Sequence, residues 1–154
     1  MKIRNHRLLK NDGRDTAFTA SPNIGVIIQA QCLIIHYTAG SGATGTVAWF
    51  QNPASKVSAH RVIARDGALT QMVAFNCEAY HAGKSQWGNI VGLNRHSIGI
   101  EIDNAGQLIK SGGKWVSPLT RHSYPDQDVT VATHKNDPPG TPPSGWRATV
   151  CGDR

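Results

Sequence analysis

A continuous apolar run occupies residues 32–38, with the sequence Cys-Leu-Ile-Ile-His-Tyr-Thr. β-Branched and aromatic residues dominate this run, and the glycine-rich segment 39–42 follows it. A run of this kind, bounded by turn residues, is typical of a strand that is buried on both faces. We therefore expect a central β-strand here, with His36 near its carboxyl end.

A short helix and a β-hairpin are predicted next. The segment 44–51 carries apolar residues and stops before Asn52-Pro53, where the restriction that proline places on its predecessor ends a helix. Segments 58–64 and 69–75 then flank a turn at 65–67, a pattern that predicts two antiparallel strands.

A further strand is predicted over 97–103, where isoleucines alternate with other residues. Because successive side chains of a strand point to opposite faces, the three isoleucines share one face, and Glu101 lies on the other. The segment 80–95 between the hairpin and this strand is a loop by composition and carries Trp87, which we expect to be exposed.

The chain has 154 residues, the size of one domain. Residues 1–22 are polar and rich in turn-forming residues, so we expect an N-terminal extension there. Proline and glycine punctuate the segment 105–154, which shows almost no periodic apolar pattern. We therefore expect a loop-rich tail over 105–154.

Sixteen basic and ten acidic residues give a net charge of +6, which favours polyanionic partners. The basic residues are scattered without interleaved aromatic residues, so nucleic acid is not an expected partner. No apolar run approaches the roughly 18 residues of a membrane span, and the basic opening is not followed by the apolar stretch of a signal peptide. We expect a cytoplasmic location, with phage or prophage lysis as another possible context.

Two residues on the predicted strands could carry chemistry. His36 lies at the carboxyl end of an apolar strand before a glycine-rich loop, where open α/β sheets bind ligands; a buried, hydrogen-bonded histidine is the alternative. Glu101 would be costly to bury without a partner, so it indicates a cation, a metal or a cavity. Its alternative is an exposed position on a half-solvated sheet.

Other candidate residues are weaker. We expect His60 to be a packing residue, and His81 to lie either on a cleft wall or on the surface. The spacing of His134 and Asp137 falls in a proline-rich segment, so nothing directs both side chains at one metal ion. Cys151 has no activating neighbour, and we expect a structural or incidental thiol.

Four segments, in this order and spacing, resemble one protein family. They read Leu33-Ile34-Ile35-His36-Tyr37-Thr38-Ala39, Val57-Ser58-Ala59-His60 with Arg65-Asp66-Gly67, Tyr80-His81-Ala82-Gly83, and Leu93-Asn94 with Ser97-Ile98-Gly99-Ile100-Glu101-Ile102. The pattern resembles the zinc-dependent N-acetylmuramoyl-L-alanine amidases (amidase type 2), a family that includes phage amidases and peptidoglycan recognition proteins. The resemblance covers about residues 20–104, extends weakly to Trp146, and is strongest with bacterial amidases that cleave anhydromuropeptides or wall fragments.

This resemblance implies an α/β fold in which helices flank a central mixed β-sheet. It implies that His36 is the first ligand of a Zn²⁺ cofactor and that Glu101 is the acid/base that activates the water. His81 and Asn94 would line the glycan-peptide cleft. The implied reaction is hydrolysis of the bond between N-acetylmuramic acid and L-alanine in peptidoglycan or muropeptides.

The second half of the chain departs from the family pattern, because the family's later ligand motifs and its transition-state lysine segment are not found there. We therefore expect one incomplete domain over 1–154, without the C-terminal helix and the last metal loop, and an incomplete zinc ligand set. An apolar sheet face around Ile98, Ile100 and Ile102 would be left exposed. Such a chain would not hydrolyse muropeptides, and a non-catalytic muropeptide-binding module is the alternative function.

Overall fold

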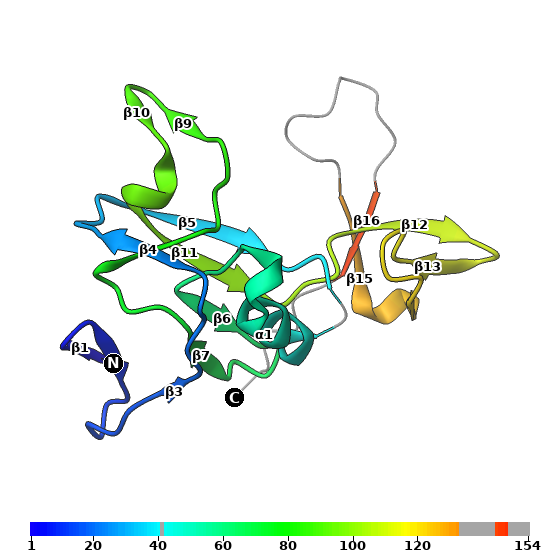
Figure 1. The fold of residues 1–154 in the computed structure, drawn as a ribbon. Coiled ribbons are helices and arrows are strands. Elements are labelled where there is room, and N and C mark those ends of the chain that lie inside the picture. Colours follow the sequence, from blue (N-terminus) through cyan, green and yellow to red (C-terminus); the bar gives the residue numbers. More distant parts are fainter. Residues whose placement is uncertain (41, 133–143, 148–154) are drawn as a thin grey trace.

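The main β-sheet of this computed structural model is mixed and has five strands in the order β3-β7-β6-β11-β5 (Figure 1). The structure describes residues 1–40, 42–132 and 144–147. β6, β11 and β5 run parallel to one another, whereas β7 is antiparallel to β6 and parallel to β3. The bounds are β3 Ala17–Phe18, β7 Leu69–Gln71, β6 Arg61–Ile63, β11 Ser97–Ile102 and β5 Cys32–Tyr37.

The strand expected over 97–103 is β11, which lies between β6 and β5. Its two faces differ as the alternation predicts. Glu101 is paired with Val62 of β6, which belongs to the core, so Glu101 lies on the core face. Ile98 and Ile100 lie on the opposite face, in an apolar groove.

The prediction of a central, doubly buried strand at 32–38 is wrong in its burial. β5 is the edge strand of the main sheet in the described part of the chain. Leu33, Ile35 and Tyr37 are 54%, 61% and 52% exposed, whereas the alternate residues are half-buried. A continuous apolar run does not distinguish a central strand from an edge strand such as β5, because the exposed face of β5 carries apolar residues as well.

Helix α1 (Ala43–Gln51) confirms the predicted short helix and packs against the core face of the sheet (Figure 1). It ends where Asn52, in an extended conformation, precedes Pro53. Its first amide, from Ala43, donates to the buried Asp103 carboxylate at 3.2 Å, which is a favourable place for negative charge. Core residues join helix and sheet: Phe50, Ala59, Val62, Met72, Val73 and Ala79.

The predicted hairpin is formed by β6 and β7, which pair antiparallel with Val62 opposite Thr70. The other short strands form three two-stranded sheets, β1-β2, β4-β8 and β9-β10, and three 3-10 helices complete the described elements. They are β1 Lys2–Arg4, β2 Arg7–Leu9, β4 Ile24–Ile27, β8 Cys77–Ala79, β9 Gln86–Trp87, β10 Ile90–Val91, and the 3-10 helices η1 Pro53–Ser55, η2 Leu93–Arg95 and η3 Asp126–Asp128. Trp87 is 69% exposed on the β9-β10 hairpin, as expected from its loop position. Residues 1–22 contain three strands, and β3 extends the main sheet.

A second five-stranded sheet forms in the segment expected to be a loop-rich tail (Figure 1). Its order is β14-β13-β12-β16-β15, and all of its strand pairs are antiparallel. The bounds are β14 Ser123–Tyr124, β13 Lys114–Val116, β12 Gln107–Ser111, β16 Ser144–Arg147 and β15 Val129–Ala132. The pattern of apolar residues did not predict these strands, because they are short and have few buried apolar side chains. In β12, Leu108 is the one buried residue.

A central mixed sheet with a helix on one face is consistent with the expected α/β fold, although strands outnumber helices among the described residues. Within residues 1–40, 42–132 and 144–147, none of the helices has the length and apolar character that a membrane span requires.

Candidate functional site

His36 and Glu101 lie next to each other on adjacent parallel strands. His36 is the fifth residue of β5, Glu101 is the fifth residue of β11, and the strand register pairs them directly. Directly paired residues of neighbouring parallel strands project from the same face of a sheet. The structure therefore brings together the two residues that the sequence placed on separate strands.

The imidazole of His81 lies on the same face, beside His36. Its Nδ1 is 3.0 Å from Nε2 of His36, and its Nε2 is 3.2 Å from Oγ of Ser97. The two rings meet edge to face, with 5.2 Å between their centroids. A Cβ atom on Gly99 would overlap the ring of His81, so a glycine in β11 is what allows the ring to reach His36.

These hydrogen bonds assign the protons of both rings. The Ser97 hydroxyl donates its one proton to the carbonyl of Leu93 at 2.6 Å, so its oxygen accepts from Nε2–H of His81. In a neutral imidazole the other nitrogen is an acceptor, so Nδ1 of His81 accepts from Nε2–H of His36. By the same rule, Nδ1 of His36 carries a lone pair that can bind a metal ion or a proton.

Burial keeps both histidines neutral. It lowers the pKa of His81 to about 4, and the nearby His36 and His60 add to this shift. Burial also lowers the pKa of His36. Neutral imidazole is the form of histidine that binds metal ions, so the environment of His36 suits a ligand.

Glu101 faces a cavity of about 460 Å³ between α1, the carboxyl end of β5 and the loop before β14. Its Oε2 atom is buried and has no hydrogen-bond partner among the described residues. Burial raises the pKa of Glu101 to about 7, because the charged form loses its solvation. A carboxyl group with this pKa can both take and give a proton near neutral pH. The side chains around it include Thr38, Thr46, Trp49, Phe50, Tyr80, His81 and Thr120.

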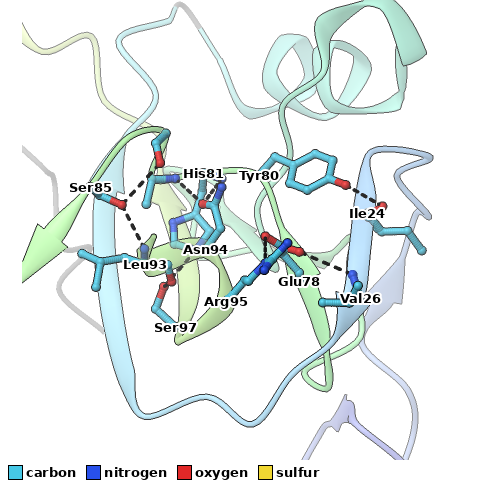
Figure 2. Close-up of polar contacts among 12 residues, drawn as sticks. Ile24, Val26, Glu78, Tyr80, His81, Ser85, Leu93, Asn94, Arg95 and Ser97 are labelled. Carbon is cyan, nitrogen blue, oxygen red and sulfur yellow. Dashed lines mark hydrogen bonds and ion pairs between the residues drawn. The ribbon is translucent and has the colours of Figure 1, made fainter. Parts of the chain in front are cut away.

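Asn94 holds the loop that carries His81 (Figure 2). Its Oδ1 accepts hydrogen bonds from the backbone amides of His81 at 3.0 Å and of Ala82 at 2.7 Å. The resemblance implied that Asn94 lines the cleft, but it is not among the described residues around the 460 Å³ cavity. The structure instead uses its side chain to fix the backbone beside the cavity.

Glu78 and Tyr80 fasten the preceding segment to β4 (Figure 2). The Glu78 carboxylate accepts from the backbone amide of Val26 at 3.4 Å and lies 3.7 Å from Nε of Arg95. The Tyr80 hydroxyl donates to the carbonyl of Ile24 at 3.0 Å. The chain is therefore anchored on both sides of His81.

His60 is a packing residue, as predicted. It is fully buried, and its Nδ1 accepts from the amide of Gly99 at 3.0 Å while its Nε2 donates to the carbonyl of Cys77 at 2.9 Å. Burial lowers its pKa, so the neutral ring satisfies two backbone groups inside the core.

Two residues at the site, Ser97 and Gly99, were missed as participants when the sequence was read. Both are small and precede Glu101 at alternate positions of one strand. Small residues at i−2 and i−4 of a strand leave room above the sheet, which is the signal that could have indicated a ring lying over them.

A catalytic zinc site uses three protein ligands and an open position. His36 fits a ligand role through Nδ1, but the described residues contain no group of three His, Cys, Asp or Glu side chains that could hold a metal ion. They therefore do not complete a zinc site. His134, Asp137 and Cys151 lie outside the described residues.

Similarity to known proteins agrees with the geometry. The chain is 36% identical over 96 residues to N-acetylmuramoyl-L-alanine amidase A of Achromobacter lyticus, covering 62% of this chain and 48% of that protein. It is 36% identical over 84 residues to 1,6-anhydro-N-acetylmuramyl-L-alanine amidase AmpD of Escherichia coli (strain K12), covering 51% and 46%. The chain thus spans about half the length of these relatives.

A crystal structure of a selenomethionine AmpD derivative superposes with a TM-score of 0.57 at 26% identity, over 67% of this chain and 66% of that chain. Residues 28–138, well over half of the chain, match the N-acetylmuramoyl-L-alanine amidase family. The family match, the shared fold and the paired His36 and Glu101 lead to one conclusion: this chain belongs to the N-acetylmuramoyl-L-alanine amidase family.

Proposed function

We propose that this chain hydrolyses the amide bond between N-acetylmuramic acid and L-alanine in peptidoglycan or in muropeptides released from it. Membership of the family supports the reaction. The name of the AmpD relative supports an anhydromuropeptide as substrate. The incomplete ligand set led us to expect from the sequence that this chain would not hydrolyse muropeptides, whereas membership of the family supports hydrolysis. Because the chain also spans about half of these relatives, the activity has to be tested on the chain itself.

The observation that carries the proposal is the carboxyl group of Glu101, which faces the cavity with a pKa of about 7. In its charged form Glu101 takes a proton from the water that attacks the amide carbonyl. In its neutral form it then gives this proton to the leaving nitrogen as the carbon–nitrogen bond breaks. The products are the carboxylate of the muramic acid lactyl group and the free amino group of L-alanine.

We infer that Nδ1 of His36 is one ligand of a zinc ion and that His81 orients it by accepting from its Nε2–H. A zinc ion at this place would supply polarisation of the amide carbonyl. His81 also lies on the cavity wall, where it can contact the substrate, and Asn94 positions the His81 loop.

The test uses the full 154-residue chain with an anhydromuropeptide, and separately with polymeric peptidoglycan, in the presence of Zn²⁺. Release of the stem peptide is followed by chromatography and mass spectrometry. Glu101→Gln should reduce the rate by roughly 100-fold or more, the usual effect of removing a general acid/base. The control is Asp126→Asn, which removes a carboxylate whose side chain is 75% exposed and lies outside the cavity, and which should leave the rate within a few-fold.

Zinc binding is measured separately, by calorimetry on the chelator-treated chain. His36→Ala should weaken it, whereas His60→Gln, at a ring that is occupied with backbone groups, should not. Equal zinc affinity in the wild type and His36→Ala would contradict the ligand assignment.

A non-catalytic muropeptide-binding module is the second candidate, and one observation favours it: the described residues do not supply three metal ligands. It predicts that the wild-type chain binds the anhydromuropeptide but releases no stem peptide at any zinc concentration. Stem-peptide release that Glu101→Gln abolishes would exclude this candidate.

A further inference from the structure

The loop that joins β13 to β14, residues 117–122, reaches the cavity of Glu101. Within the described segment 105–132, Thr120 of this loop is the one residue that lines the cavity. The other lining residues belong to α1, to the main sheet and to the segments next to them. The 117–122 loop is therefore placed to contact a molecule that the cavity binds.

Internal hydrogen bonds hold the 117–122 loop in one shape. Ser117 is fully buried, and its Oγ accepts from the backbone amide of Thr120 at 3.2 Å. Its carbonyl accepts from the amide of Arg121 at 2.9 Å, and its amide donates to the carbonyl of His122 at 2.9 Å. The loop is thus closed on itself, and Thr120 and Arg121 have a defined place at the edge of the cavity.

Arg121 has a backbone conformation that arginine disfavours. Its φ is +61°, in the left-handed region, where Cβ comes too close to a neighbouring carbonyl oxygen and glycine is preferred. Residues held in such conformations cluster at functional sites. The residue is exposed, and its guanidinium forms no ion pair with the acidic side chains of the described residues. It is therefore available to bind an anion beside the cavity.

The cavity itself does not suit an anion. Its described lining residues include no lysine or arginine, and Glu101 is the one acidic residue among them. A ligand carboxylate inside the cavity would meet the charged form of Glu101 without a cation to offset the repulsion. The carboxylates of a ligand therefore have to lie at the rim. Arg121 is at that rim, because its Cα lies about 3.8 Å from that of Thr120.

Lys56 is a second exposed cation next to a lining residue, because it precedes Val57. Its ammonium group binds as a point charge on a flexible side chain. The planar guanidinium of Arg121 can instead donate two parallel hydrogen bonds to the two oxygens of one carboxylate. Arg121 is therefore the residue that we expect to distinguish a carboxylate from an uncharged amide.

We propose that Arg121 binds a carboxylate of the stem peptide and thereby sets the direction in which a muropeptide lies in the cavity. This inference rests on the proposed function, which supplies the substrate. An anhydromuropeptide is uncharged on the sugar side of the scissile amide bond and carries its free carboxylates on the peptide side. With the peptide at the 117–122 loop, the uncharged sugar side lies against the cavity walls.

The test compares two anhydromuropeptides with a stem of L-alanine and glutamate, one with free carboxylates and one in which these groups are amides. Binding to the full 154-residue chain is measured by calorimetry with a chelator present, which separates binding from hydrolysis. The wild type should bind the acid about tenfold more tightly than the amide at low ionic strength, as expected for a charge-assisted pair of hydrogen bonds. Added 0.5 M NaCl should reduce this preference, because salt screens an exposed charge pair.

Four variants identify the residue responsible. Arg121→Gly suits the positive φ and removes the guanidinium, so it should keep the loop and bind both ligands equally, whereas Arg121→Lys should keep part of the preference. The matched control is Arg14→Gln, at an exposed arginine outside the cavity that pairs with Asp12, and it should keep the full preference. Lys56→Gln should keep it too. A preference that Arg121→Gly retains, or that Lys56→Gln abolishes, would overturn the proposal.

The role of Arg121 and the proposed hydrolysis fail in different measurements. An Arg121-dependent preference for the acid without release of stem peptide would support the binding role and contradict the hydrolysis. Release of stem peptide with equal KM for the acid and the amide would support the hydrolysis and overturn the role of Arg121. A wild type that binds neither ligand would overturn that role as well.

Discussion

The imidazole of His81 lies directly over the backbone of Gly99, in the space that a side chain at position 99 would need. This contact lets one ring nitrogen reach Ser97 on β11 and the other reach His36 on β5. A glycine in the middle of a strand weakens that strand, so its presence here is explained by the ring above it.

Gly99→Ala should displace His81 and destabilise the chain by about 1–3 kcal/mol, the usual cost of overpacking. Gly45→Ala is the matched control, because it adds the same methyl group in α1 with no atom within 4 Å. That substitution should stabilise the chain by about 0.5–1 kcal/mol. Urea denaturation measures both, and a neutral Gly99→Ala variant with an unshifted His81 ring signal would contradict the packing described.

Asn94→Ala should loosen the His81 loop, since two backbone amides lose their acceptor. The expected loss of local stability is about 1–3 kcal/mol. Hydrogen exchange of the His81 and Ala82 amides would report it as faster exchange. Asn94→Asp keeps an acceptor oxygen and should preserve most of the protection; equal exchange in both variants and the wild type would count against this role.

His60 and His36 should differ in their contribution to stability. His60→Ala removes a fully buried ring and leaves the Gly99 amide and the Cys77 carbonyl without partners, at a cost of about 3 kcal/mol or more. His36→Ala removes a half-buried ring with one hydrogen bond, at a cost of about 1 kcal/mol. Chemical denaturation of metal-free protein tests the order, and the reverse order would refute the packing role of His60.

The pKa of Glu101 is raised to about 7 in the folded chain from an ordinary value of 4.5, so folding favours its neutral form. The unfolded chain releases the proton first, and Glu101 therefore removes stability as the pH rises from about 4.5 to 7. The Glu101→Gln variant does not lose this stability, because glutamine does not titrate. The difference in unfolding free energy between variant and wild type should grow in favour of the variant over that range and then level off.

The buried His81 also changes the unfolding free energy over a similar pH range, but its contribution rises with pH whereas that of Glu101 falls. Its pKa is lowered to about 4 from 6.5, so its contribution to stability is present above 6.5 and is lost as the pH falls toward 4. The contribution of His81 cancels when the unfolding free energy of Glu101→Gln is compared with that of the wild type, because both proteins contain His81. A constant difference from pH 4.5 to 8, measured with a chelator present, would disprove the shift of Glu101.

Local sequence patterns predicted the helix and strands of the main sheet, but they did not predict how deeply each strand is buried. The alternation at 97–103 separated Glu101 from the isoleucines, and Asn52-Pro53 marked the end of α1. The apolar run alone did not predict the exposure of Leu33 and Ile35, because an apolar residue reads the same whether or not another element covers it. The expected absence of the C-terminal helix did predict an exposed apolar sheet face, and Leu33 and Ile35 lie on that face, paired with Ile98 and Ile100.

Contacts between distant segments were also beyond the sequence patterns. The hydrogen bond from His36 to His81 depends on how the loop after β8 folds back over β11, which no periodicity encodes. Which hydrogen-bond partners the described residues offer to Nε and Nη2 of Arg61 likewise depends on the neighbours that its strand acquires. The resemblance to the amidases supplied the roles of His36 and Glu101 as expectations, and the strand register supplied their proximity.

Asp103, which receives the first amide of α1, stands two residues after Glu101 on the same side of the chain. The carboxyl groups of Glu101 in β11 and of Asp103, which follows the last residue of β11, are thus about 6.6 Å apart along the extended chain. A slip of β11 by a single residue would turn both carboxylates into the apolar groove and set isoleucines in their places. Insertions in the exposed β9-β10 hairpin leave that spacing intact, so sequence drift should be tolerated there and rejected between Ser97 and Asp103.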